Sequence, residues 1–158
     1  MSKNNSIVHY MDIAYNEAIK GINANNGGPF GAVVVRDDIP IASAHNEVLT
    51  SKDPTAHAEI NAIRKASQIL NSYDLSECTL YTTCEPCPMC LGAILWARIE
   101  KVYYVSTKED ARDAGFDDSH FYDILQGKVR STKLTQIEHQ DSKKLFELWK
   151  KKSDIQIY

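Results

Sequence analysis

The sequence predicts an α/β fold in which helices sandwich a partly parallel sheet. Four short runs rich in β-branched and aromatic residues have the length and composition of buried strands. Longer stretches around them have apolar residues that recur with helical period. Because strands that alternate with helices form crossover connections, part of the sheet is expected to be parallel. At 158 residues the chain can build a hydrophobic core, and we expect one domain spanning residues 1–158.

The expected elements follow one another without a linker or an internal repeat. Strands are expected at residues 31–36, 39–46, 78–83 and 101–106, and Asp37 and Asp38 form the hairpin turn between the first two. Helices are expected at residues 7–24, 56–70, 88–97, 121–125 and 141–152. Loops are expected at residues 50–55 and 114–119, and a fifth, edge strand is expected within 129–137.

The charge and hydropathy of the chain narrow the classes of partner. The formal net charge is −3, which argues against a large nucleic-acid footprint because such surfaces are normally basic. The lysines of the last expected helix are interpreted as a solvated face, with RNA contact as the alternative. No apolar run is long enough to span a membrane, and the first residues lack the apolar segment of a signal peptide. We therefore expect a cytoplasmic location and a small, weakly charged substrate.

The most informative stretch is residues 83–90, TCEPCPMC, which contains three of the four cysteines. A strand-like run precedes it and an apolar helical run follows, and Pro88 stands where proline is favoured, at the first position of a helix. Cys87 and Cys90 are then neighbours on one helical face, beside the positive end of the helix dipole, which favours thiolates. Two thiolates at this spacing are half of a zinc site.

The other half of the site is expected in residues 53–59, DPTAHAE, at the start of the preceding helix. Asp53 or Thr55 can cap this helix, and His57 offers a nitrogen ligand. In a continuous helix His57 and Glu59 would point about 200° apart, so both can face one metal only if His57 lies at the first turn. The cap residues favour that position for His57.

These residues predict a catalytic zinc site. His57, Cys87 and Cys90 supply three protein ligands, and the fourth position stays open for water. Glu59 lies beside this water, where a carboxylate can take a proton and later deliver it to a substrate nitrogen.

Cys84 allows a different interpretation. If it also bound zinc, the four ligands would close a structural Cys₃His site, and the chain would be a zinc-binding module rather than an enzyme. Strand alternation places Cys84 on the same side as Thr82, toward the packing layer of the sheet, so we favour the open site.

The paired motifs resemble those of the zinc-dependent cytidine/deoxycytidylate deaminase superfamily, in which His-x-Glu is followed by Pro-Cys-x-x-Cys. Residues 27–34, 53–59 and 84–94 are similar to both bacterial guanine deaminases and tRNA adenosine deaminases. The loop at residues 114–119, AGFDDS, and the aromatic last residue, Tyr158, resemble the guanine deaminases.

This resemblance implies a fold and a reaction. The fold is a three-layer α/β/α arrangement with a central five-stranded mixed sheet. The reaction is the hydrolytic deamination of guanine to xanthine and ammonia, with one zinc ion per chain. Glu59 moves the protons, and the resemblance implies that Asp118 assists at the amino group of guanine.

The resemblance also implies a set of substrate-binding residues. Asn46 hydrogen-bonds the purine edge, since an amide can donate and accept at once, and Phe30 stacks on the ring. Trp96, the backbone around Ala58 and the terminal Tyr158 are further candidates. The family forms homodimers, and in the guanine deaminases the C-terminal segment, about residues 141–158 here, is exchanged so that Tyr158 lies at the pocket of the partner subunit.

Several alternatives stay open. Asp118 could cap the helix that follows it, Asn46 could end its strand in a turn, and Phe30 and Trp96 could belong to the core. The alternative enzymes are a tRNA wobble-adenosine deaminase and a deaminase of cytosine, nucleosides or triazine-like heterocycles. The alternative without catalysis is the closed zinc module.

Overall fold

The computed structural model describes residues 3–129, 132, 134–137, 141 and 144–153. Each of the four strands expected at residues 31–106 lies within one residue of its predicted bounds. The elements in chain order are α1 (Lys3–Asn23), β1 (Gly31–Arg36), β2 (Ile39–His45), α2 (Val48–Ser51), α3 (Ala58–Leu70), β3 (Cys78–Cys84), α4 (Pro88–Trp96), β4 (Lys101–Ser106), α5 (Lys108–Asp113), α6 (Ser119–Leu125) and α7 (Lys144–Lys150).

The strands form one mixed sheet in the order β2-β1-β3-β4. β1 pairs antiparallel with β2 on one side and with β3 on the other, whereas β3 and β4 are parallel. The parallel pair is connected through α4, because parallel neighbours need a crossover. The α/β class and the partly parallel sheet are therefore confirmed.

The five-stranded sheet is not confirmed, because the part of the chain that the structure describes contains four strands. Within residues 129–137, residues 130, 131 and 133 lie outside the described part, and the others are not in a strand. Leu134 and Ile137 are 92% and 80% exposed, so no neighbouring strand covers the apolar side chains that suggested an edge strand. β4 is the edge of the described sheet.

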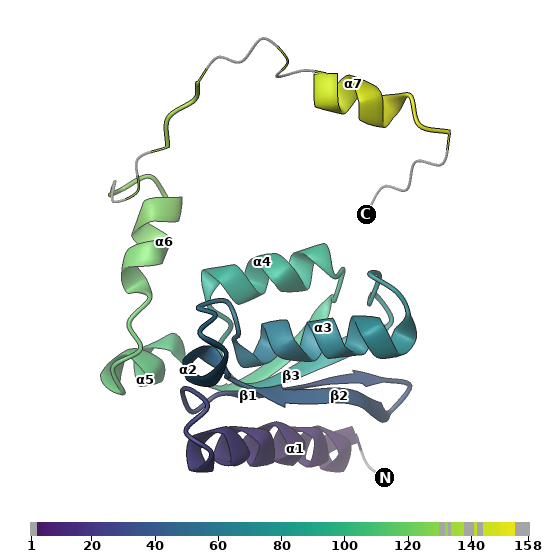
Figure 1. The fold of residues 1–158 in the computed structure, drawn as a ribbon. Helices are drawn as coiled ribbons and strands as arrows, with labels where there is room; N and C mark the ends of the chain where they lie inside the picture. Colours follow the sequence, from purple (N-terminus) through teal and green to yellow (C-terminus); the bar gives the residue numbers. More distant parts are fainter. Residues whose placement is uncertain (1–2, 130–131, 133, 138–140, 142–143, 154–158) are drawn as a thin grey trace.

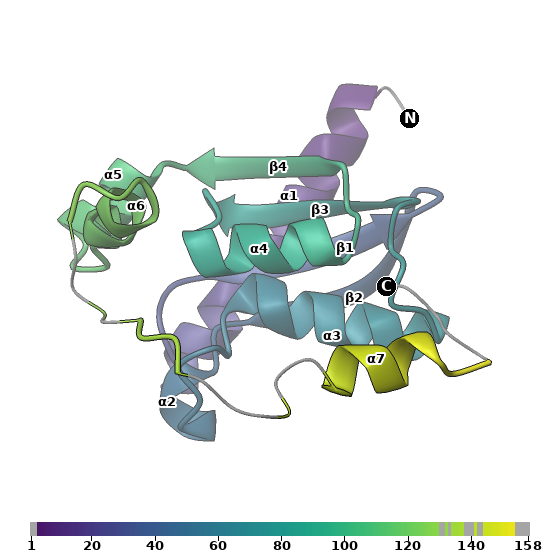
Figure 2. The same ribbon diagram turned by 90° about the horizontal axis from the view of Figure 1, so that it is seen from above.

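Helices cover both faces of the sheet. α1 lies on one face, and α3 and α4 lie on the other (Figure 1). Figure 2 shows, from above, α3 and α4 running along the strands with α1 behind them. The central strand β1 is buried toward both layers: Ala32 and Val34 join the core cluster under α3, and Val33 and Val35 join the cluster under α1. This double burial explains why β1 is a continuous apolar run rather than an alternating one.

Two backbone features fix the start of the sheet. Asp37 and Asp38 have φ of 51° and 60°, the left-handed conformation that a tight two-residue hairpin requires. Gly31 lies against α1 so closely that a Cβ there would be 2.0 Å from the carbonyl oxygen of Ala14. The missing side chain at residue 31 is what lets α1 pack directly on β1.

The helices depart from the expected bounds more than the strands do. α1 begins at Lys3 rather than at residue 7, and α7 is shorter than the expected helix at 141–152. α2 and α5 were not expected. α5 begins with a capping box, in which the Thr107 side chain accepts from Asp110 N and the Asp110 side chain accepts from Thr107 N. Among the described residues, no helix is both long and apolar enough to cross a membrane.

Candidate active site

The N-terminal ends of α3 and α4 bring the predicted ligands together. His57 precedes α3 and Cys87 precedes α4, and both have an extended backbone, with φ and ψ of −71° and 157° for His57 and −65° and 167° for Cys87. Neither side chain makes a capping hydrogen bond to its own helix. The helix starts only after His57, so the side chains of His57 and Glu59 are not held on opposite sides of a helix.

The expected cap of α3 is wrong by two to four residues. Asp53 Oδ1 accepts hydrogen bonds from Thr55 N at 2.8 Å and from Thr55 Oγ1 at 2.7 Å, so Asp53 closes a turn ahead of the helix. An aspartate that bonds to the backbone two residues on is typical of turns. His57 occupies the cap position instead.

The ligand atoms of His57, Cys87 and Cys90 all lie within 4.8 Å of one another. His57 Nδ1 is 3.6 Å from Cys87 Sγ and 3.5 Å from Cys90 Sγ. For tetrahedral zinc with Zn–S of about 2.3 Å and Zn–N of about 2.05 Å, the N···S separation is about 3.5–3.6 Å. The three side chains therefore fit a zinc ion in their present arrangement.

The two thiols are strongly coupled. Hydrogen bonds from Cys90 and from His57 lower the pKa of the Cys87 thiol to about 4, against the effect of burial. The hydrogen bond to Cys87 and burial raise the pKa of the Cys90 thiol. Metal binding releases protons from thiols because cysteine ligates as the thiolate.

Glu59 lies in the first turn of α3 and is only 5% exposed. Burial raises the pKa of its carboxyl above the ordinary value. A carboxyl with a raised pKa can accept a proton at one step and donate it at another near neutral pH. Its position beside the zinc ligands therefore suits general acid–base chemistry.

A cavity of about 500 Å³ opens beside this group, which is a usual size for a small-molecule site. Its lining includes most of the predicted site residues: His57, Cys87, Glu59, Asn46, Phe30 and Asp118. Residues separated by up to about ninety positions in the sequence thus meet at one cavity. Cys90 lies behind this surface and is fully buried.

Asn46 is a buried part of the cavity wall. Its side-chain oxygen accepts hydrogen bonds from Gly28 N at 3.3 Å and from Val48 N at 3.1 Å. The oxygen closes the turn after β2, as the alternative for Asn46 expected, and the residue also lines the cavity. Among the described residues no acceptor bonds to its Nδ2, so the Asn46 side chain offers the cavity a donor.

Phe30 and Asp118 line the cavity from different elements. The ring of Phe30 meets that of Phe116 edge to face, with centroids 5.0 Å apart. Asp118 is the residue before α6, but its side chain makes no capping hydrogen bond there, and Asp117 bonds to Ser119 N instead. Burial and the charge of Cys87 raise the pKa of Asp118.

Like Cys90, the predicted site residues Ala58 and Trp96 do not line this cavity. Ala58 is fully buried in the core beneath it. Trp96 is 68% exposed, so the alternative in which it belongs to the core is wrong. Apolar residues occupy most of the circumference of α4, so periodicity could not tell which of them face inward. Tyr158 lies outside the described residues.

Phe116 and Lys108 are among the lining residues that the sequence analysis missed. Phe116 packs on Phe30, and Lys108 stands at the start of α5, where its Nζ lies 4.9 Å from the centroid of the Tyr122 ring. α5 is a charged helix without an apolar stripe, so periodicity does not reveal it. The Thr107–Asp110 capping box was the one signal in the sequence that could have found this helix.

Cys84 stands apart from the zinc ligands. The ligand group found among the described residues contains His57, Cys87 and Cys90 but not Cys84. Cys84 is buried, its thiol donates to the Thr107 carbonyl at 3.6 Å, and burial raises the pKa of the thiol to about 11. The geometry favours the open, three-ligand site over the closed structural one.

Comparisons with known proteins agree with this site. The model of the cytidine and deoxycytidylate deaminase zinc-binding region matches residues 4–106. Guanine deaminase of Bacillus subtilis (strain 168) is 50% identical over 135 residues, which are 84% of this chain and 86% of that protein. The tRNA-specific adenosine deaminase of Aquifex aeolicus (strain VF5) is 43% identical over 96 residues, 61% of this chain and 63% of that protein. The crystal structure of guanine deaminase from Bacillus subtilis superposes with a TM-score of 0.91 at 44% identity and covers 100% of this chain and 99% of its own.

Proposed function

Because the chain belongs to the cytidine and deoxycytidylate deaminase family, we propose that it hydrolyses guanine to xanthine and ammonia as an enzyme of purine metabolism. The observation that carries the proposal is the buried Glu59 carboxylate, which lines a small-molecule cavity beside three zinc-type ligands. Identity with a guanine deaminase over 84% of the chain supports the substrate.

The first part of the mechanism is proton transfer by Glu59. Zinc, held by His57, Cys87 and Cys90, supplies Lewis-acid chemistry that makes water nucleophilic near neutral pH. Glu59 accepts a proton from the attacking water and delivers it to the ring nitrogen next to the carbon that carries the amino group. The pKa of Glu59, raised by burial, suits both directions of transfer.

A second carboxyl completes the mechanism. The amino group is a poor leaving group until it is protonated, so a second proton donor beside it would help ammonia to leave. We assign the amino group to Asp118, which lines the same cavity and whose pKa is raised by burial and by the charge of Cys87. Guanine and water together then give xanthine and ammonia without any other reactant.

The cavity wall supports guanine over adenosine. The Asn46 oxygen is engaged by two backbone N–H groups, so the side chain presents a donor to the purine. Guanine has two adjacent acceptors, O6 and N7, along this edge, whereas adenine has N7 beside an amino donor. Phe30, held edge to face by Phe116, offers an apolar ring at the same cavity for stacking on the base.

A tRNA adenosine deaminase is the second candidate, because such enzymes are among the relatives of this chain. An enzyme of that class binds RNA through a basic surface, and its activity falls steeply with salt. The formal net charge of −3 speaks against such a surface. Turnover of guanine that is insensitive to salt would separate the two candidates.

We also propose that the enzyme is a homodimer with an exchanged C-terminal segment, about residues 141–158. α7 lies away from the sheet and its covering helices (Figure 1), and its apolar residues Leu145, Phe146 and Leu148 are exposed. A second copy would cover them, and Tyr158 would then reach the pocket of that copy. Light scattering on the native chain and on a chain ending at residue 140 tests this, since the shorter chain should lose the dimer.

We propose a cytoplasmic location for the enzyme, which is in keeping with its four free cysteines.

The test of the function is ammonia release from guanine by zinc-loaded protein. The matched control is Glu59→Gln, which keeps the shape of the side chain but cannot take a proton. We expect the variant to keep one zinc per chain and to lose activity by a factor of about 10²–10⁴, the usual contribution of general acid–base catalysis. A zinc-loaded native enzyme that releases no ammonia from guanine would overturn the proposal, and cytosine, nucleosides and an anticodon stem-loop would be tried next.

A further inference from the structure

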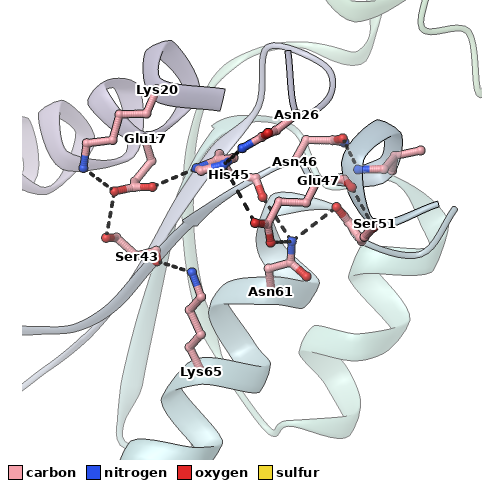
Figure 3. Close-up of polar contacts among 12 residues, drawn as sticks. Glu17, Lys20, Asn26, Ser43, His45, Asn46, Glu47, Ser51, Asn61 and Lys65 are labelled. Carbon is pink, nitrogen blue, oxygen red and sulfur yellow. Dashed lines mark hydrogen bonds and ion pairs between the residues drawn. The ribbon is translucent and has the colours of Figure 1, made fainter. Parts of the chain in front are cut away.

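A cluster of polar side chains lies between α1, β2 and α3 (Figure 3), next to Asn46 of the cavity wall. Its centre is Glu17 of α1, which is only 9% exposed. Three donors surround this carboxylate: Lys20 Nζ at 2.7 Å, Ser43 Oγ at 3.3 Å and His45 Nδ1 at 3.0 Å. A buried carboxylate is costly unless it is paired and hydrogen-bonded, so Glu17 holds its partners in place. The mechanism proposed above uses none of these groups.

The hydrogen bonds of His45 fix its tautomer. Asn26 Nδ2 lies 2.9 Å from His45 Nε2, and since an amide nitrogen donates, Nε2 accepts. The ring proton is therefore on Nδ1, which donates it to Glu17. Gly21 of α1 leaves space for the ring, because a Cβ at that position would lie 2.8 Å from His45 Cδ2. Glu47 Oε1 lies 4.0 Å from Nε2 on the same side as Asn26, so the ring of His45 is held from both sides in a single orientation.

The bond from Asn26 to His45 closes a ring of contacts that includes the cavity wall. Two residues after Asn26, Gly28 N donates to the side-chain oxygen of Asn46, which directly follows His45. The Asn26 carbonyl also accepts from Leu49 N at 2.9 Å. The loop at residues 26–28 is therefore held at Asn26 by His45, which does not line the cavity, and at Gly28 by Asn46, which does.

His45 is also hydrogen-bonded to α3, the helix that follows the zinc ligand His57. Asn61 of α3 donates through Nδ2 to the carbonyl of His45 at 3.1 Å and to Glu47 Oε2 at 3.0 Å (Figure 3). Asn61 N in turn donates to the carbonyl of His57 at 2.9 Å. The cluster thus connects the cavity wall at Asn46 with the start of α3.

We propose that His45 is a positioning residue that aims the amide of Asn46 at the purine. Glu17 fixes the tautomer, the fixed tautomer accepts from Asn26, and the loop that follows Asn26 holds the Asn46 oxygen so that its Nδ2 faces the cavity. This inference rests on the proposed function. His45 acts on substrate binding and takes no part in zinc binding or proton transfer.

Two substitutions separate the two hydrogen bonds of His45. In His45→Asn the amide nitrogen can take the place of Nδ1 and still donate to Glu17, but the side chain is too short to accept from Asn26. In His45→Gln the amide oxygen reaches the place of Nε2 and accepts from Asn26, but the donor to Glu17 is lost. Ser43→Ala is the control, because it weakens the surroundings of Glu17 and leaves the bond from Asn26 to His45 intact.

The two His45 variants should have opposite rankings in KM and in the urea midpoint of unfolding. His45→Asn should raise the KM for guanine about fivefold, the factor that one net hydrogen bond represents, with kcat and zinc content close to native. His45→Gln should change KM less and lower the urea midpoint of unfolding more, and Ser43→Ala should change only the urea midpoint. A KM raised equally in both His45 variants, or raised in Ser43→Ala, would overturn the role of His45.

One further measurement tests the role of His45 without using the substrate. The ¹⁵N shifts of the His45 ring in the native enzyme should show a protonated Nδ1 and an unprotonated Nε2, and the opposite tautomer would refute the inference. A native enzyme that is inert toward guanine would instead refute the proposed function. An active enzyme with equal KM in the two His45 variants would refute only the positioning role.

Discussion

Replacing Gly27 with alanine should weaken guanine binding and leave zinc in place. A Cβ at residue 27 would lie 2.1 Å from the Asn46 side-chain oxygen and 2.7 Å from its backbone oxygen. Cβ atoms in real structures do not approach other atoms closer than 3.0 Å, so Asn46 and the loop must move apart. The Asn46 oxygen cannot then keep its hydrogen bonds to both Gly28 N and Val48 N.

The magnitude follows from these two hydrogen bonds. Each hydrogen bond contributes about 0.5–1.5 kcal/mol net, so the conformation of Asn46 in which Nδ2 faces the cavity is destabilised by about 1–3 kcal/mol. If the amide contacts guanine equally in the ground state and the transition state, KM should rise about 5–150-fold with little change in kcat. His57, Glu59 and Cys87 are not among the atoms that the new Cβ would approach most closely, so zinc content should stay at one per chain.

The assay is steady-state ammonia release over a range of guanine concentrations, with zinc measured on the same samples. Gly92→Ala is the control, since a Cβ at that position of α4 meets nothing within 4 Å. It should leave KM unchanged and stabilise the chain by about 0.5–1 kcal/mol, because glycine is unfavourable inside a helix. A native KM in Gly27→Ala, or a loss of zinc as large as the loss of activity, would refute the reasoning.

Three further outcomes are expected. Cys90→Ser should abolish stoichiometric zinc binding, whereas Cys84→Ser should keep one zinc per chain, and metal analysis of both variants distinguishes the open site from the closed one. Gly31→Ala should destabilise the fold by at least about 1–3 kcal/mol in urea titration, because its Cβ would meet backbone atoms of α1 that cannot rotate away. Although burial raises the pKa of Glu17, hydrogen bonds from Lys20 and His45 bring it below its ordinary value of 4.5. Its stabilisation is therefore present above about pH 4.5 and is lost as the pH falls through the folded pKa. The urea midpoints of the native chain and Glu17→Gln should accordingly differ at pH 7 and converge in acid, and a gap independent of pH would contradict this.

The strands and the metal ligands could be predicted because both depend on short stretches of sequence. β1 is a continuous apolar run bounded by Gly31 and the Asp37–Asp38 turn. The three zinc ligands lie at or near the starts of two helices, His57 at α3 and Cys87 and Cys90 at α4. A proline at the first helical position, or the point where helical apolar periodicity begins, indicates such a start in the sequence. In both cases the information lies within a few residues of the feature.

The walls of the cavity depend on contacts that no local pattern reveals. Phe116 and Lys108 belong to a charged region of the chain, and only the fold brings them to the cavity that Phe30 also lines. For Trp96 the neighbouring residues are apolar on every side, so the sequence could not show which side of α4 is exposed. The engagement of the Asn46 oxygen by Gly28 and Val48 likewise depends on the loop before β1 approaching the end of β2.

The extended residues that precede α3 and α4 also bear on which changes of length the chain tolerates. Cys90 lies three residues beyond Cys87, and one residue inserted between them would rotate Cys90 by about 100° around the axis of α4, away from His57. Cys87 lies 30 residues beyond His57, and this interval includes the connection from α3 to β3, where an added residue alters neither helix start. Insertions and deletions are therefore admissible in the connection at residues 71–77 and are excluded between Cys87 and Cys90.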